Sequence, residues 1–209
     1  MRIDFVSDVA CPWCAVGLHA LEQALHRIGP ALPVQLHFQP FELNPQMPPE
    51  GEDLVQHLAR KYGASPEQLA ATHATLRQRG AELGFEFGQR TRIWNTFDAH
   101  RLLHWAGLEG RQRELKHALL RAYHTNGENV GAAAVLLRLC AEVGLDASRA
   151  AAILAGDEFA AEVRDAERRW QALGIQSVPS VVIDGRHLIQ GGQPSEAFER
   201  ALRQLAAAG

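Results

Sequence analysis

The order of apolar and polar residues predicts alternating strand and helix at the start of the chain. Residues 2–7 alternate as a short strand does, and residues 34–38 do so again. Between them, leucines and an isoleucine recur at helical spacing from about Pro12 to Ile28, and a Gly-Pro pair ends the run. A strand, a helix and a second strand in this order predict a β-α-β unit with a parallel pair of strands.

The middle of the chain has a different pattern. Residues 44–51 form a link rich in proline and glycine, and no convincing strand follows between residue 53 and about residue 169. Residues 65–68 have the sequence Ser-Pro-Glu-Gln, which is typical of a helix start with a capping box. Further helices are expected at 97–106, 111–124, 131–143 and 148–154, with a last one that ends near Gly174.

Strand character returns near the C-terminus. Residues 180–183 and 187–190 are predicted strands joined by the turn Asp184-Gly185, and a final helix begins within residues 193–196. The predicted fold class is therefore α/β. One domain would consist of residues 1–43 and 166–209, interrupted by an all-helical insertion over residues 44–165. This prediction requires the first strand to share a sheet with residues 180–183.

Composition narrows the class of protein. The chain has 209 residues, of which 46% are hydrophobic and 22% are charged, and its formal net charge is −3. These values argue against a disordered chain and against a strongly basic protein that binds nucleic acid or a membrane surface. No apolar stretch approaches the roughly 18 residues of a transmembrane helix, and no signal peptide is visible. We therefore expect a cytoplasmic protein.

The residues Cys11-Pro12-Trp13-Cys14 come directly after the first strand and open the first helix. Unpaired N–H groups and the helix dipole stabilise a thiolate at that position, so we expect a lowered pKa for Cys11. Pro12 fits the first turn because its missing N–H has no partner to lose. Cys14 lies one turn along the same face, where the pair can cycle between dithiol and disulfide. Trp13 is expected to flank the exposed sulfur and to contact a bound partner.

Metal binding and inert burial are the alternative interpretations of this pair. A structural zinc site needs two further ligands, and the third cysteine, Cys140, lies in a helical stretch with no partner nearby. His100 and His104 are four residues apart on a predicted helix, but the glutamate of the zinc-protease signature is absent between them. The pattern favours a redox pair over both alternatives, and no metal is expected.

Val178-Pro179 precedes the predicted strand at 180–183. A proline at the start of a strand carries little information alone. In a protein with a CxxC motif, a cis bond here would expose the backbone N–H and C=O of Val178 beside the cysteines. An extended substrate peptide could pair with those groups. Gly191-Gly192 is either a turn or a place where a substrate backbone can approach closely, and the sequence leaves both open.

The chain as a whole resembles the DsbA-family thioredoxin-fold oxidoreductases, in particular the FrnE-like branch. The resemblance rests on residues 7–14, 41–45, 95–102 and 178–194, which together span nearly the full length. It implies a thioredoxin fold interrupted by a helical domain, with Cys11 as the nucleophile, Cys14 as the resolving thiol and Pro179 in cis. It supplies no substrate, no direction for the redox chemistry and no oligomeric state.

Thioredoxin-like proteins often have a buried acid in the first strand that helps to move a proton from the resolving thiol. Two residues of this chain fit that description in part: Asp4 lies in the strand, and Asp8 comes three residues before Cys11. Asp8 could tune the thiol, or it could cap the helix from its loop. The sequence leaves both roles open.

Dithiol–disulfide exchange on protein or small-molecule thiols is the leading prediction, with protein disulfide isomerisation as a related activity. The 2-hydroxychromene-2-carboxylate isomerases and kappa-class glutathione transferases have the same interrupted fold. They typically carry serine at the position of Cys11 and lack the second cysteine. A third class is a non-catalytic chaperone that holds peptides beside the helical domain. We expect no bound cofactor, with glutathione as the candidate co-substrate, and no nucleic-acid or membrane partner.

Overall fold

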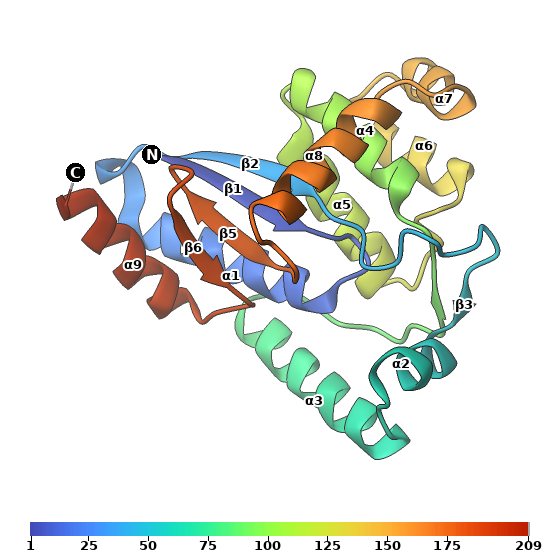
Figure 1. The fold of residues 1–209 in the computed structure, drawn as a ribbon, viewed down its shortest axis with the longest axis horizontal. Helices are drawn as coiled ribbons and strands as arrows, with labels where there is room; N and C mark the ends of the chain where they lie inside the picture. Colours follow the sequence, from blue (N-terminus) through green and yellow to red (C-terminus); the bar gives the residue numbers. More distant parts are fainter. Residues whose placement is uncertain (209) are drawn as a thin grey trace.

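The computed structural model describes residues 1–208 and contains a four-stranded mixed sheet (Figure 1). Its strands, in spatial order, are β2 (Gln35–Pro40), β1 (Arg2–Ser7), β5 (Ser180–Ile183) and β6 (His187–Gln190). β1 pairs in parallel with β2 and antiparallel with β5, and β5 and β6 form an antiparallel hairpin. The first strand therefore shares a sheet with residues 180–183, as the fold prediction required.

Three helices cover the two faces of this sheet: α1 (Pro12–Ile28), α9 (Ser195–Ala208) and α8 (Ala160–Ala172). Ile3 and Phe5 of β1 are buried in one core with α1 and α9, which lie side by side. Val6 and Val182 pack instead with Trp170 of α8. Successive residues of a strand point to opposite faces, so the alternation of apolar side chains along β1 makes a layered α/β arrangement.

Helices from the middle of the chain pack around a second apolar core: α4 (Phe97–Leu108), α5 (Gln112–His124), α6 (Ala133–Glu142) and α7 (Ala147–Ala155). Leu102 and Leu119 are among its fully buried residues. Val9 and Ala10, from the loop after β1, belong to the same core. The helices of the insertion therefore pack directly against the loop that leads to the cysteines.

α5 also closes the outer edge of the sheet at β2. The side-chain oxygen of Gln112 accepts a hydrogen bond from the Phe38 N–H at 3.0 Å. Its side-chain nitrogen donates to the carbonyls of Phe38, at 3.1 Å, and Leu103, at 3.2 Å. This one amide thereby pairs backbone groups that an edge strand would otherwise leave open.

A separate arm contains α2 (Leu54–Tyr62), α3 (Pro66–Glu82) and the paired two-residue strands β3 (Glu52–Asp53) and β4 (Arg92–Ile93). The prediction that no strand occurs between residue 53 and about residue 169 is wrong at β4, because two residues are too few to show an alternating pattern. The capping box of α3 is confirmed: Ser65 and Gln68 each accept a hydrogen bond from the other's backbone N–H, at 3.3 and 2.9 Å respectively.

Two buried carboxylates share one arginine beside α8. Glu42 and Glu167 are both buried, and Nη1 of Arg164 donates to both of them, at 2.9 Å to Glu167. The Arg164 guanidinium also lies 3.8 Å from the centroid of the Phe97 ring. Burial raises the pKa of Glu42, and the charge of Glu167 raises it further. One oxygen of each carboxylate has no hydrogen-bond partner among the described residues.

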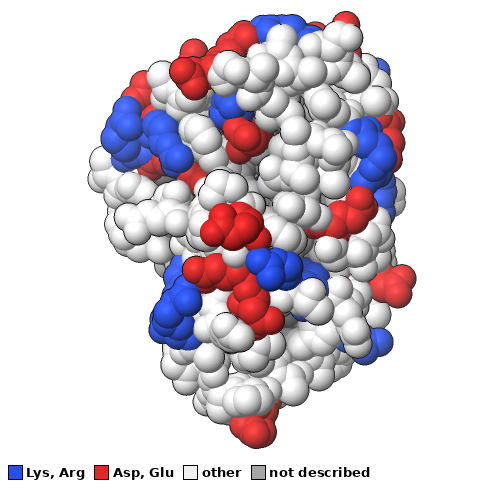
Figure 2. Space-filling model, turned by 90° about the vertical axis from the view of Figure 1, so that its right-hand side faces the viewer, with Lys and Arg blue, Asp and Glu red and all other residues white. Residues whose placement is uncertain are grey.

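Two further features concern the outside of the molecule. Within residues 1–208, no helix combines the length and the apolar character that crossing a membrane requires. On the face shown in Figure 2, acidic and basic side chains are interspersed. The predicted domain boundary at residue 166 falls inside α8, and the division of the chain into two domains stays a prediction.

Candidate active site

Cys11 and Cys14 lie at the first turn of α1, where the loop after β1 enters the helix. Cys11 is the N-cap residue, with an extended backbone at φ −85° and ψ 114°, and Pro12 follows in the first turn. The Cys14 N–H donates to the Cys11 carbonyl at 3.1 Å, so the backbone between the two residues already forms a turn. Both thiols are free. The sulfurs are thus carried by a single turn at the positive end of a helix dipole.

Both cysteines are buried, and only Cys11 keeps any exposed surface. Cys14 is fully buried and Cys11 is only 4% exposed. The expectation that the Cys11 sulfur is exposed is therefore wrong, because Cys11 lies in an apolar core that Trp13 and Val178 help to cover. The Cys11 S–H donates to the Val178 carbonyl at 3.6 Å. Burial raises the pKa of Cys14 well above its ordinary value, and the hydrogen bond and charge of Cys11 raise it further.

The loop before β5 touches the first turns of α1. The Val178–Pro179 bond is cis. A Cβ on Gly17 of α1 would lie 3.0 Å from Cγ of Pro179, so any other residue at position 17 would have to push this contact apart. Gly191 has a φ of +80°, and a Cβ on Gly192 would lie 3.1 Å from the Trp13 carbonyl, so this pair lies tightly against the first turn of α1. Close approach of a substrate backbone here stays a prediction.

Two side chains from the insertion reach this side of α1. Arg79 of α3 lies over the Trp13 ring, 5.5 Å from its centroid, and donates to the Gly192 carbonyl at 2.7 Å. Tyr62, at the end of α2, is 59% exposed. Burial raises the pKa of Tyr62, and the charge of Cys11 raises it further. Trp13 is half-buried under this cover.

Asp8 lies fully inside the structure and is bonded from several directions. It accepts hydrogen bonds from the N–H of Leu43 at 2.7 Å, the hydroxyl of Thr96 at 2.8 Å and the N–H of Ala10 at 3.1 Å. Nε2 of His100 lies 3.5 Å away. Burial raises the pKa of Asp8, but His100 and the backbone donors outweigh it and hold the pKa below its usual value. Asp8 is therefore a stable anion that ties the cysteine loop to the insertion.

Asp4, the other acid considered from the sequence, has different partners. It accepts hydrogen bonds from Arg2, at 2.7 and 2.8 Å, and from Gln39 at 2.7 Å. Burial raises its pKa, but these donors lower it by more. Asp4 belongs to the sheet, and Asp8 is the acid that the fold places beside the cysteine loop.

Lys116 of α5 is a further buried charge at this site, and the sequence analysis missed it. Its side chain is fully buried, and Nζ has no hydrogen-bond partner among the described residues. Burial lowers the pKa of Lys116, whereas the negative charges of Cys14, Asp8 and Cys11 raise it, in that order of size. One signal was available: of the 21 basic residues only two are lysines, at positions 61 and 116.

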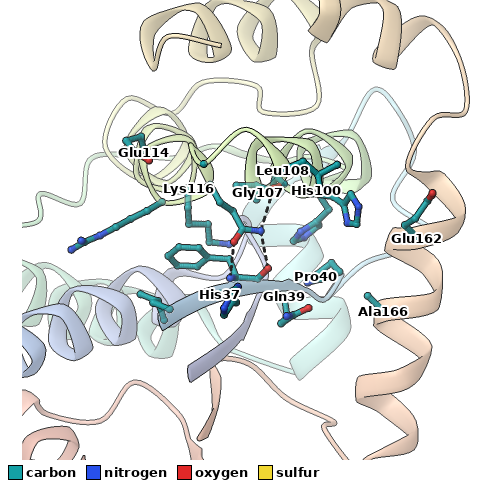
Figure 3. Close-up of a pocket in the computed structure, with 17 residues that line it drawn as sticks. His37, Gln39, Pro40, His100, Gly107, Leu108, Glu114, Lys116, Glu162 and Ala166 are labelled. Atoms are coloured by element: carbon teal, nitrogen blue, oxygen red, sulfur yellow. Dashed lines mark hydrogen bonds between the residues drawn. The ribbon is translucent and has the colours of Figure 1, made fainter. Parts of the chain in front are cut away.

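A cavity of about 500 Å³ lies between β2 and the helices α4, α5 and α8 (Figure 3). Lys116 and His100 form part of its wall, and Glu162 of α8 stands on the opposite side. In Figure 3 the Lys116 side chain points from α5 toward β2. Nε2 of His100, like the Lys116 amine, has no hydrogen-bond partner among the described residues.

The remaining residues considered from the sequence lie away from the sulfurs. Cys140 is buried in the core of the insertion, where burial raises its pKa to about 11. His104 packs on Phe159, with 5.1 Å between the ring centroids. Within residues 1–208 no group of three or more histidines, cysteines or acids is arranged to hold a metal ion.

Comparison with solved structures extends these observations. The probable DsbA oxidoreductase SCO1869 from Streptomyces coelicolor has a TM-score of 0.91 and 36% identity, covering 99% of this chain and 90% of that one. Two structures below 25% identity show the same fold. A 2-hydroxychromene-2-carboxylate isomerase has a TM-score of 0.72 at 14% identity, with full coverage of both chains. The cytosolic disulfide reductase DsbM from Pseudomonas aeruginosa, solved with GSH, has a TM-score of 0.67 at 22% identity, covering 99% of this chain and 100% of that one.

The sequence also matches a family profile over nearly its whole length. The profile describes a DSBA-like thioredoxin domain, and it matches residues 2–203. The matched region contains the strands of the sheet, the inserted helices and the cysteine pair at the start of α1. The thioredoxin fold with a helical insertion is therefore confirmed, and the chain belongs to the DSBA-like thioredoxin domain family of thiol-disulfide oxidoreductases.

Proposed function

We propose that this protein exchanges dithiols and disulfides through Cys11 and Cys14, with Cys11 as the nucleophile and Cys14 as the resolving thiol. The observation that carries the proposal is the pair of free thiols on the first turn of α1, with the Cys11 sulfur 3.6 Å from the Val178 carbonyl. Cys11 stands where the unpaired N–H groups of the helix favour a thiolate. Cys14 has no exposed surface, so an external disulfide meets Cys11 first.

The reaction follows from this arrangement. In the reducing direction, the Cys11 thiolate attacks one sulfur of a substrate disulfide, and the other substrate sulfur leaves as a thiolate. Cys14 then loses its proton and attacks the Cys11 sulfur of the mixed disulfide. The second substrate sulfur leaves and takes up a proton. The substrate is reduced by two electrons and the cysteine pair is oxidised by two; the oxidising direction is the reverse.

The backbone of Val178 supplies a place for an extended substrate. In the dithiol form its carbonyl accepts from the Cys11 S–H. A Cys11 sulfur bonded to substrate carries no hydrogen, so the carbonyl is then released to accept from a substrate N–H. Trp13 adds an apolar surface beside this position, and the Arg79 guanidinium lies over its ring. Protein or small-molecule thiols, including glutathione, in the cytoplasm are the partners we propose.

Single cysteine variants test the assignment. Cys11→Ser should abolish reduction of insulin disulfides and of oxidised glutathione, whereas Cys14→Ser should accumulate mixed disulfides because it cannot resolve them. Cys140→Ser is the matched control and should react as the unmodified protein does, since Cys140 lies in the core of the insertion. Iodoacetamide at pH 6 should label Cys11 before Cys14, because burial raises the pKa of Cys14. Identical behaviour of the Cys11 and Cys14 variants would refute the assignment.

The reduction potential of the pair decides the direction. A value near about −270 mV would indicate a reductase, and one near about −120 mV would indicate an oxidant. An activity that depends on glutathione, survives Cys14→Ser and produces no net oxidation would instead favour the isomerase class, whose fold this chain shares.

A further inference from the structure

We propose that Arg79 of α3 is a positioning residue for the thiol exchange: it holds the Trp13 ring in place and so restricts the approach of a substrate to Cys11. The inference rests on the proposed dithiol–disulfide exchange and adds to it a residue of the helical insertion that controls the first step. Arg79 acts through Trp13 and the neighbouring Gly191-Gly192 turn, not on the reacting sulfur itself.

Cys11 is poorly accessible in the dithiol form. The first step of the exchange brings a substrate sulfur into contact with the Cys11 sulfur. Cys11 is only 4% exposed, and it lies in an apolar core against which Trp13 and Val178 pack. A substrate disulfide therefore reaches the sulfur only after part of this cover has moved.

The Val178 side of the cover is held by backbone structure. Val178 and Pro179 lead directly into β5, an inner strand of the sheet, and the Pro179 carbonyl accepts from the Gly191 N–H at 2.8 Å. Movement of this side would break backbone hydrogen bonds. The Trp13 side chain is half-buried on the first turn of α1, and a rotamer change moves its ring without disturbing the helix. The movable part of the cover is therefore the Trp13 ring.

Arg79 makes two contacts that restrict this ring. Its guanidinium lies 5.5 Å from the ring centroid and donates to the Gly192 carbonyl at 2.7 Å. The Gly192 backbone is also close to Trp13, since a Cβ there would lie 3.1 Å from the Trp13 carbonyl and 3.6 Å from Cε3 of the ring. The guanidinium and the turn are thus both neighbours of the ring, and the hydrogen bond between them limits its movement.

The Arg79 backbone is fixed, although most of α3 is exposed. Leu76 and Gly80, the buried residues of α3, lie three residues before Arg79 and one residue after it. A Cβ at Gly80 would overlap the Phe85 carbonyl, so the helix packs tightly there. A carbonyl and an aromatic face attract a guanidinium less strongly than a carboxylate does, so the contact can be released as the ring moves. Arg79 therefore combines a fixed backbone with a contact that can open.

The hydrogen bond to the Gly192 carbonyl sets the size of the expected effect. At its lower end, the contribution of a hydrogen bond to a charged group corresponds to about a tenfold change in an equilibrium constant. Side-chain rotation is much faster than alkylation, so a reagent attacks Cys11 at a rate proportional to the fraction of molecules that are open. Removal of the Arg79 guanidinium should therefore speed this attack about tenfold.

Alkylation of Cys11 by iodoacetamide measures this access without requiring catalysis. All proteins carry Cys14→Ser, so the reagent meets only Cys11 and Cys140, which mass spectrometry follows separately. The rate is measured from about pH 5 to about pH 10. The midpoint of the profile reports ionisation of the thiol, whereas the plateau at high pH reports access to the thiolate. Arg79→Met removes the donor and its charge, and Arg77→Met, which removes a charge from an exposed position of the same helix, is the matched control.

We expect Arg79→Met to raise the plateau rate at Cys11 about tenfold and Arg77→Met to leave it unchanged. Labelling of Cys140, which is buried in the core of the insertion, should stay equally slow in all proteins. In a Trp13→Ala background the ring is absent, so Arg79→Met should add less than about twofold there.

An unchanged plateau in Arg79→Met would overturn the proposal, and so would a shift of the midpoint alone, because Arg79 would then act only through its charge. A rise that Cys140 shares would also overturn it, since the whole fold would then have loosened. A rise of about tenfold that persists in Trp13→Ala would do so as well. Oxidised glutathione separates this proposal from the proposed function: if none of these proteins forms a mixed disulfide at Cys11, the proposed function fails, whereas the alkylation result stands.

Discussion

Replacing Lys116 with methionine should make the protein more stable, because it removes a buried amine with no hydrogen-bond partner among the described residues. A buried polar group left unpaired costs about 1–3 kcal/mol, and methionine has nearly the length of lysine with an apolar chain that suits the site. Lys116→Met should therefore raise the free energy of unfolding by about 1–3 kcal/mol at pH 7.

The sign of the pH dependence provides a second check. Burial lowers the pKa of Lys116 in the folded chain, so below about pH 10.4 the unfolded chain binds the extra proton. The loss of stability in the unmodified protein therefore grows as pH falls from that value toward the folded pKa. The advantage of Lys116→Met should be larger at pH 7 than at pH 10.

Urea unfolding followed by circular dichroism, with the thiols kept reduced, measures both effects. Lys61→Met is the matched control, since it also removes one positive charge, but from an exposed side chain that donates to the Leu43 carbonyl and to Asn44. The control should be neutral or slightly destabilised at both pH values. A Lys116→Met midpoint at or below that of the unmodified protein at pH 7, with an unchanged slope, would refute the reasoning. So would an advantage that does not shrink toward pH 10.

Two further predictions concern the fold. Arg164→Met leaves Glu42 and Glu167 buried without their cation. In urea unfolding at pH 7 this variant should be less stable by about 3 kcal/mol. This is the lower end of the cost of breaking a buried ion pair, because Arg164 is partly exposed. The loss should be smaller at pH 5 than at pH 7, because the raised pKa of Glu42 favours protonation of its carboxyl as the pH falls. An equal loss at both pH values would count against this. Gly80→Ala should destabilise α3 by about 1–3 kcal/mol despite the better helix propensity of alanine, because a Cβ there would overlap the Phe85 carbonyl. Ala71 is exposed in the same helix, so Ala71→Gly measures the difference in helix propensity alone, which should be about 1 kcal/mol. A Gly80→Ala variant more stable than the unmodified protein would refute the prediction, because the neighbouring backbone would then have moved to make room.

The sequence predicted the elements that have a strong periodic or capping signal. α1 and the strands β5 and β6 occur at the predicted residues, because helical spacing, a Gly-Pro stop and the Asp184-Gly185 turn act locally. α2 was missed because it buries only one residue, His57, so no apolar stripe marks it. A helix without an apolar stripe cannot be predicted from the local spacing of apolar residues.

In the candidate site too, residues that belong to a local motif were predicted and residues placed by tertiary packing were not. The cysteine pair and Pro179 carry motifs that a sequence displays. Lys116 and Arg79 do not, because their positions beside other elements are settled only by tertiary packing. The scarcity of lysine in the chain was the one available signal for Lys116. The burial of Cys11 was likewise beyond a local pattern, since Val178 is distant in sequence.

The bonds around Asp8 have a consequence for dissecting the molecule. Its partners come from the loop itself, from the link after β2 at Leu43 and from the insertion at Thr96 and His100. A shortened chain that kept only the sheet and its helices would lose the partners of Asp8 at Thr96 and His100. It would also expose Val9, which packs in the core of the inserted helices. Deleting the middle of the chain therefore does not yield a minimal domain with an intact cysteine loop. Transfer of the cysteine loop to another protein would require transfer of the inserted helices as well.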